Sequence, residues 1–131
     1  MKPAILKNIL YVEDDSDIQE VARVALEAVG GFTLKVCSSG QEAIEAIKSD
    51  FIPDLILLDV MMPQMDGRAT LTELRKLPVV CNTPVIFMTV KVQPYEVNEY
   101  LSQGALGVIA KPFDPLLLSE KILAHWNQYK T

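Results

Sequence analysis

The sequence predicts an α/β fold: a doubly wound, five-stranded parallel sheet with helices on both faces. Short apolar runs of strand length alternate five times with longer segments whose apolar residues recur at helical spacing. Gly, Pro, Asn, Asp and Ser residues separate the two kinds of segment. Alternation of this kind favours a parallel sheet with right-handed crossovers. We expect the strand order 2-1-3-4-5.

The five predicted strands are short and rich in apolar residues. They are expected at residues 8–12, 32–37, 55–58, 85–88 and 107–110. The third run, Leu55 to Leu58, has no polar residue, which is typical of a parallel strand buried on both faces. Four of the strands stop at a polar residue.

The predicted helices are marked by capping residues and helix breakers. Ser16 and Ser39 each precede Gln or Glu by three residues, as in a capping box. Pro94 is expected in the first turn of the fourth helix, and Asp114 is expected to cap the fifth, with Pro115 at its first position. The expected inward-facing residues, in chain order, are Ile18, Val21, Ala22, Ala25, Leu26, Val29, Ala43, Ile44, Ile47, Leu71, Leu74, Leu77, Val97, Tyr100, Leu101, Leu118, Ile122, Trp126 and Tyr129.

The composition is that of one globular domain, which we expect to cover residues 1–131. Hydrophobic residues make up 50% of the chain and charged residues 22%. The formal net charge of -5 argues against direct nucleic-acid binding, which needs a basic face. The sequence has no Lys/Arg-rich amphipathic stretch and no apolar run of spanning length, so we expect no membrane association. We expect a cytoplasmic protein in which Cys37 and Cys81 are unpaired thiols.

Acidic residues follow two strands that should be neighbours in the sheet. Glu13 and Asp14 come after the first strand, and Asp59 ends the third. At an effective dielectric of about 20, two carboxylates about 4 Å apart repel each other by about 4 kcal/mol, so the group needs a cation or a proton. Oxygen ligands favour Mg²⁺ over zinc or copper, and the backbone carbonyl of Met61 is a further candidate ligand. The alternative is a set of solvated acids near helix N-termini.

Two more polar residues end strands at the same predicted edge. Thr89 offers a hydroxyl and Lys111 an ammonium group, and with Mg²⁺ they would suit the oxygens of a phosphoryl group. Asp59 could then act as a nucleophile that forms an aspartyl phosphate. Taken alone, a lysine such as Lys111 is more often a surface residue, but its position just before a proline at a strand end favours a functional role. His125, beside Trp126, is expected to pack or lie at the surface rather than to carry a phosphoryl group.

Four motifs together give the chain a resemblance to a known family. They are ILYVEDD at 9–15, LLDVMMPQMDG at 57–67, FMT at 87–89 and KPF at 111–113. With Asp59, Thr89 and Lys111 at their spacing, the sequence resembles the receiver domain of bacterial two-component response regulators. The resemblance covers essentially the whole chain and implies a flavodoxin-like, receiver-like fold.

The resemblance also implies roles for individual residues. Asp59 would accept a phosphoryl group from a histidine kinase, and Thr89 and Lys111 would bind the phosphoryl oxygens. The Lys111-Pro112 peptide would be cis. The implied Mg²⁺ ligands are Glu13, Asp14, Asp59 and the carbonyl of Met61.

The expected role is a phosphorylation-controlled signalling switch rather than an enzyme, although the domain would assist its own phosphoryl transfer and dephosphorylation. Its expected partners are a sensor histidine kinase or phosphotransfer protein and a downstream protein target. The domain would be a monomer or a weak, phosphorylation-linked dimer.

The sequence is also consistent with other functions. Val90 stands where the family usually has a small residue, and Val108 where it usually has an aromatic. These departures favour, as the alternative, a receiver-like protein-binding module with weak or altered phosphorylation control. Enzymes on related folds fit less well. The acids after the first strand would repel the phosphate of a flavodoxin cofactor, and Met61 stands where an aspartate-nucleophile phosphatase needs a second acid.

Overall fold

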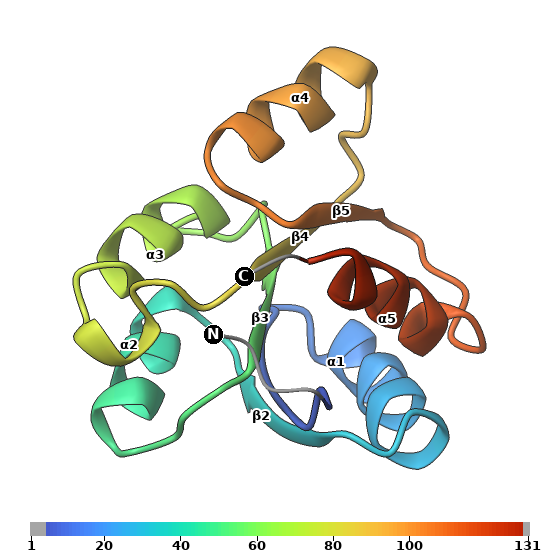
Figure 1. Cartoon of the computed structure of the whole chain (residues 1–131), viewed down its shortest axis with the longest axis horizontal. Helices are drawn as coiled ribbons and strands as arrows, with labels where there is room; N and C mark the ends of the chain where they lie inside the picture. The colour runs from blue at the N-terminus through green and yellow to red at the C-terminus, as the bar shows by residue number, and fades with distance from the viewer. Residues whose placement is uncertain (1–4, 130–131) are drawn as a thin grey trace.

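The computed structural model describes residues 5–129 and shows one five-stranded parallel sheet with helices on both faces (Figure 1). The strand order is β2-β1-β3-β4-β5, which confirms the predicted fold class and order. The strands are β1 (Asn8–Val12), β2 (Thr33–Cys37), β3 (Leu55–Asp59), β4 (Val85–Thr89) and β5 (Gly107–Ala110). The helices are α1 (Ser16–Arg23), the π-helix η1 (Val24–Val29), α2 (Gly40–Lys48), α3 (Gly67–Leu74), the 3₁₀-helix η2 (Pro78–Val80), α4 (Pro94–Ser102) and α5 (Leu118–Gln128).

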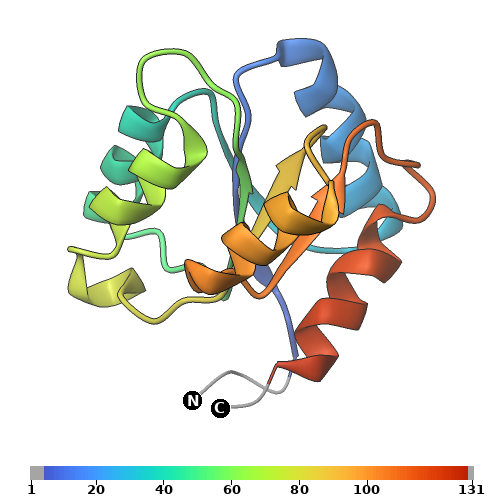
Figure 2. The same ribbon diagram turned by 90° about the horizontal axis from the view of Figure 1, so that it is seen from above.

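The sheet separates two hydrophobic layers. Seen from above, α2 and α3 cover one face of the sheet while α1 and α5 cover the other (Figure 2). Leu58 and Phe87 pack in the layer with α2 and α3, whereas Leu57 and Ile86, their neighbours along the strands, pack in the layer with α1 and α5. All residues of β3 and β4 are buried. These central strands therefore hold the end of β3 in a fixed place.

The register of the strands brings their C-terminal ends to a single edge. Val12 pairs with Leu58, Asp59 with Met88, and Thr89 with Ala110. The residues that follow β1, β3, β4 and β5 therefore leave the sheet side by side. Ligand sites of open α/β sheets lie at this edge.

Helix α1 begins one residue earlier than the capping-box prediction. Asp15, not Ser16, is its N-cap, because the Asp15 carboxylate accepts hydrogen bonds from the backbone N–H groups of Asp17 (2.9 Å) and Ile18 (3.1 Å). A charged acceptor that binds two N–H groups outcompetes a neighbouring hydroxyl. The cap of α2 is as predicted, since Ser39 accepts a hydrogen bond from the N–H of Glu42 (3.1 Å).

Helix α5 begins later than predicted. Asp114 caps a turn rather than the helix, because its carboxylate accepts a hydrogen bond from the N–H of Leu116 (2.9 Å) and its carbonyl accepts one from Leu117 (3.0 Å). This local side-chain bond competes with helix formation. The regular helix starts at Leu118, and the predicted start at Pro115 is wrong.

The π-helical segment explains why part of the predicted inward face of the first helix is wrong. Val29 is 55% exposed although its spacing predicted burial. A π-helix has more residues per turn, which rotates later positions away from the core. The segment packs tightly against α5, where the buried Ser119 hydroxyl donates a hydrogen bond to the carbonyl of Ala25 (2.9 Å).

Within residues 5–129, no helix combines the length and the apolar character needed to cross a bilayer.

The two cysteines differ in accessibility, which predicts their reactivity. Cys37 is 2% exposed, and burial raises the pKa of its thiol to about 11, whereas Cys81 is exposed. Because the thiolate is the reactive form, we expect a disulfide reagent at pH 8 to modify Cys81 rapidly and Cys37 only after unfolding in urea. The absorbance of the released thiol measures both phases. Rapid modification of the native Cys81→Ser variant would contradict the assigned burial.

Candidate functional site

An acidic cluster lies at the C-terminal edge of the sheet, where β1 and β3 end. One carboxylate oxygen from each of Glu13, Asp14 and Asp59 lies within 4.8 Å of the others. Glu13 and Asp59 are buried, whereas Asp14 is exposed to solvent. The set consists of hard oxygen donors with one open side, which fits a hydrated Mg²⁺ ion. The structure therefore brings together the three acids that the sequence placed at two strand ends.

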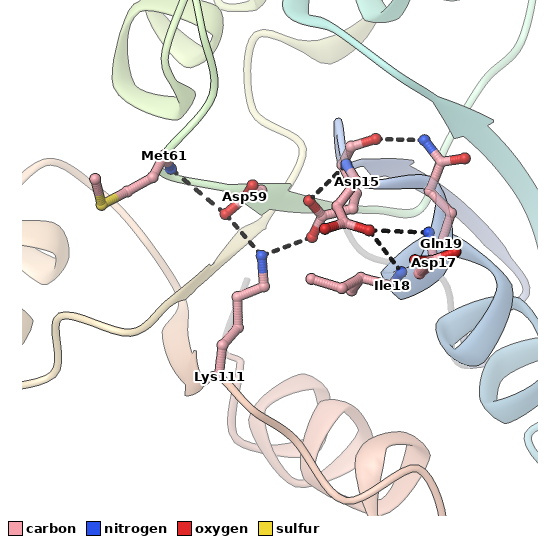
Figure 3. Close-up of polar contacts among 8 residues, drawn as sticks. Asp15, Asp17, Ile18, Gln19, Asp59, Met61 and Lys111 are labelled. Atoms are coloured by element: carbon pink, nitrogen blue, oxygen red, sulfur yellow. Dashed lines mark hydrogen bonds and ion pairs between the residues drawn. The ribbon is translucent and has the colours of Figure 1, made fainter.

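Lys111 supplies a positive charge to this cluster. Its ammonium nitrogen lies 2.7 Å from Glu13 Oε1 and 3.1 Å from Asp59 Oδ1 (Figure 3). The side chain is only 12% exposed. Its backbone N–H donates a hydrogen bond to the carbonyl of Thr89 (2.9 Å), and the Lys111-Pro112 peptide is cis, as expected. Lys111 therefore joins both buried acids rather than extending into solvent.

Backbone and amide groups fix Glu13 from the opposite side. The N–H of Asp15 donates a hydrogen bond to Glu13 Oε2 (3.2 Å). The side-chain amide of Gln19 donates to the backbone carbonyl of Glu13 and to the hydroxyl of Ser38 (3.0 Å). The sequence predicts a capping role for Gln19. Its position one helical turn after the acids is the sequence signal for this contact.

Burial dominates the protonation of the buried acids. It raises the pKa of Glu13 to about 7, and the charge of Asp59 adds to the rise while Lys111 opposes it. Burial also raises the pKa of Asp59, against the opposing charge of Lys111. For Lys111, burial alone would lower the pKa, but the hydrogen bond with Glu13 and the charge of Asp59 hold it above its ordinary value. A single ammonium group therefore balances the two buried acids only in part.

The loop after β3 folds back tightly over Asp59. The N–H of Met61 donates a long hydrogen bond to Asp59 Oδ1 (3.4 Å), and the Met61 side chain is 53% exposed. Gly67, the first residue of α3, donates its N–H to the carbonyl of Val60 (2.8 Å). A Cβ atom on Gly67 would lie 2.4 Å from the carbonyl oxygen of Asp59. Only glycine therefore lets α3 approach the strand this closely.

Thr89 is buried at the end of β4, next to the site. Its hydroxyl accepts a hydrogen bond from the N–H of Lys91 (3.0 Å) and so belongs to the turn after the strand. Val90 is 63% exposed, so its bulk lies in solvent. Val108 is half-buried and packs against the cluster that contains Phe87.

Residues 9–123 match the family model for the response regulator receiver domain. The chain belongs to this family. It is 35% identical over 117 residues to the transcriptional regulatory protein CseB of Streptomyces coelicolor, a match that covers 89% of this chain and 48% of CseB. It is 35% identical over 123 residues to the probable C4-dicarboxylate response regulator DctR of Bacillus subtilis, a match that covers 93% of this chain and 53% of DctR. The chain thus spans about half the length of these curated relatives.

Solved receiver structures share the fold. The chemotaxis response regulator CheY4 of Vibrio cholerae superposes with a TM-score of 0.81 at 26% identity, covering 92% of this chain and 99% of CheY4. A CheY-like receiver domain from Methanospirillum hungatei gives a TM-score of 0.78 at 29% identity, covering 95% of this chain and 96% of that domain. Receiver domains are signalling modules of two-component systems rather than classical enzymes, and phosphorylation carries their signal.

The raised pKa of Glu13 predicts a pH-dependent stability. Between its ordinary value of 4.5 and about 7, the folded protein holds a proton that the unfolded chain has lost. The contribution of Glu13 to the unfolding free energy should therefore fall by about 1–3 kcal/mol as pH rises through this window. Urea unfolding of wild type and Glu13→Gln in metal-free buffer, from pH 4 to pH 8, should show a flatter profile for the variant. Parallel profiles for wild type and Glu13→Gln would contradict the predicted proton on Glu13. The control is Glu20→Gln, a change at an exposed position of α1, which should give the wild-type profile.

The contact between Gly67 and Asp59 predicts a stability cost for any side chain there. We expect Gly67→Ala to lower the unfolding free energy by about 1–3 kcal/mol, because the new methyl group would meet backbone atoms that cannot move aside cheaply. Urea unfolding measures the change. Ala69→Ser adds one atom at an exposed position in the same helical turn, and it should leave the stability nearly unchanged. Wild-type stability of Gly67→Ala would show that α3 can shift.

Proposed function

We propose that Asp59 is the phosphoacceptor of this receiver domain and that a sensor histidine kinase or a phosphotransfer protein is the donor. The observation that supports this most is the position of Asp59: a buried carboxylate at the end of a central strand, beside Glu13, Asp14 and Lys111. The carboxylate is fixed in place, yet the cluster opens to solvent at Asp14. A phosphoryl donor can therefore approach from that side.

Glu13, Asp14, Asp59 and the carbonyl of Met61 would hold Mg²⁺. The bound ion would offset the negative charge that the phosphoryl oxygens bring to an already acidic site. Lys111 is close enough to Asp59 to bind one of these oxygens, and the Thr89 hydroxyl, which accepts a hydrogen bond from the N–H of Lys91, would donate its O–H to another. The residues around Asp59 would thus bind the transferred group in place of water.

The transfer is a displacement at phosphorus. A carboxylate oxygen of Asp59 forms a bond to phosphorus while the bond from phosphorus to the donor histidine nitrogen breaks. The nitrogen keeps the electron pair of that bond, and a proton on the other ring nitrogen of the phosphohistidine lets the imidazole leave in its neutral form. Later attack by water on the same phosphorus releases inorganic phosphate and restores the Asp59 carboxylate. Preorganised charge and position are the contributions of the domain to both steps.

The phosphorylated state would act on a downstream protein. The added group carries about -1.5 to -2 charges and three acceptor oxygens, so the polar contacts of Lys111 and Thr89 would rearrange. The net charge of -5 supports a protein target rather than direct contact with nucleic acid. We therefore propose a switch that works through protein contacts of the domain.

A binding module with little phosphorylation control is the second candidate. Val108 favours it, because the family usually has an aromatic residue at this position, whose side chain swings inward on activation. A half-buried valine cannot reproduce that rotation. Partner affinity separates the two candidates: a switch binds differently with and without phosphodonor, and only in proteins that keep Asp59. Equal affinities for wild type and Asp59→Asn in both conditions would support the module.

Phosphorylation can be tested directly with acetyl phosphate and Mg²⁺. We expect intact-mass spectra of the wild type to gain the mass of one phosphoryl group. Asp59→Asn should gain none, and removal of Mg²⁺ by a chelator should abolish the gain in wild type. Asp50→Asn is a matched control, because Asp50 is exposed and its φ of 75° is well tolerated by asparagine. Labelling of Asp59→Asn at the wild-type level would refute the assignment.

A further inference from the structure

Helix α4 is held to the domain by few side chains. Tyr100 is its one buried residue, at 2% exposed, and the predicted inward position of Leu101 is wrong, since that side chain is 43% exposed. A groove of about 500 Å³ separates α4 from the loop after β3 and is lined in part by Met61 and Lys91. In Figure 1, α4 stands apart from the other helices. Its position must therefore depend on a small set of contacts.

Arg68, in the first turn of α3, crosses to α4 and makes two of these contacts. Its guanidinium nitrogen lies 2.7 Å from Glu99 Oε1. The guanidinium carbon also lies 5.5 Å from the centre of the Tyr100 ring, which is within range for a cation–π interaction. One side chain therefore joins α3 to both a charged and an aromatic residue of α4.

The same turn of α3 is in contact with Asp59. Arg68 follows Gly67, whose close approach to the Asp59 carbonyl leaves no room for a Cβ atom. The N–H of Gly67 is bonded to the carbonyl of Val60 (2.8 Å). Because protein interiors are densely packed, a shift of the Asp59 backbone must displace the start of α3 and, with it, Arg68.

A second connection reaches the same part of α4 from β4. The Tyr100 ring lies 5.4 Å from the ring of Phe87, measured between centres. Phe87 is two residues before Thr89 on this strand. Movement of Thr89 toward a phosphoryl group would therefore also change the contact between Phe87 and Tyr100.

We propose that Arg68 is a positioning residue that couples the state of Asp59 to α4. In the unphosphorylated domain, the Arg68 contacts hold α4 in place. Phosphorylation of Asp59 displaces the first turn of α3, weakens these contacts and frees α4. This coupling rests on the proposed function, and it needs no aromatic residue at position 108.

Amide hydrogen exchange of α4 tests the coupling. The variants are Arg68→Gln, Glu99→Gln and the double variant, each measured by mass spectrometry before and after treatment with acetyl phosphate and Mg²⁺. Before treatment, Arg68→Gln should exchange about five- to tenfold faster than wild type in α4, the effect of losing an ion pair and a cation–π contact. Glu99→Gln loses only the ion pair and should show a smaller increase. The double variant should exchange little faster than Arg68→Gln, because the ion pair is already lost in that single variant. Treatment should speed exchange in wild type but change Arg68→Gln little.

Matched variants separate this effect from general destabilisation. Lys76→Gln removes an ion pair of the same length, 2.7 Å to Glu73, that does not reach α4, so it should behave as wild type. Arg68→Lys keeps a positive charge without the planar group and should restore part of the wild-type protection.

The intact mass of the same samples distinguishes the two proposals. Wild-type α4 protection in Arg68→Gln, or an undiminished response to treatment in a variant whose mass shows phosphorylation, would overturn the coupling alone. Absence of a mass gain in wild type would overturn the proposed function, whereas faster exchange in the untreated variants would still support Arg68 as the residue that holds α4.

Discussion

Two buried carboxylates that share one ammonium group are the constraint on which the rest of this structure depends. Glu13 and Asp59 lie out of solvent, and Lys111 contacts both within 3.1 Å. Buried charges are tolerated only when they are paired, and one lysine cannot offset these acids together with Asp14. The parallel order of the strands brings the groups to one edge. The remaining excess of negative charge would favour a cation at that edge.

The surroundings of the acids divide into a rigid part and a part that can move. On one side, Gln19 and the N–H of Asp15 bind Glu13, and the helices behind them are densely packed. On the other side, the start of α3 contacts Asp59, and α4 is attached through Tyr100, through Arg68 and through its contacts with β5. In this arrangement, a small change could shift the helix without disturbing the fixed site, as the proposed switch needs.

The features that follow from chain order could be predicted from the sequence, whereas those decided by competing side chains could not. Strand order and the convergence of Glu13, Asp14 and Asp59 follow from the alternation of apolar segments and the acids at their ends. Spacing alone favoured Ser16 as the first cap, but the carboxylate of Asp15 accepts two hydrogen bonds instead. The π-helical segment and the contact of Arg68 with α4 arise from tertiary packing, which no local pattern encodes.

The hydrogen bond from Ser119 to the carbonyl of Ala25 joins residues 94 positions apart in the chain. A buried carbonyl that lacks this partner is costly, so the first helical layer is complete only when the last helix is present. During synthesis, nearly the entire domain must leave the ribosome before this layer can close. The contact between η1 and α5 therefore forms late, although the two segments are made at opposite ends of translation.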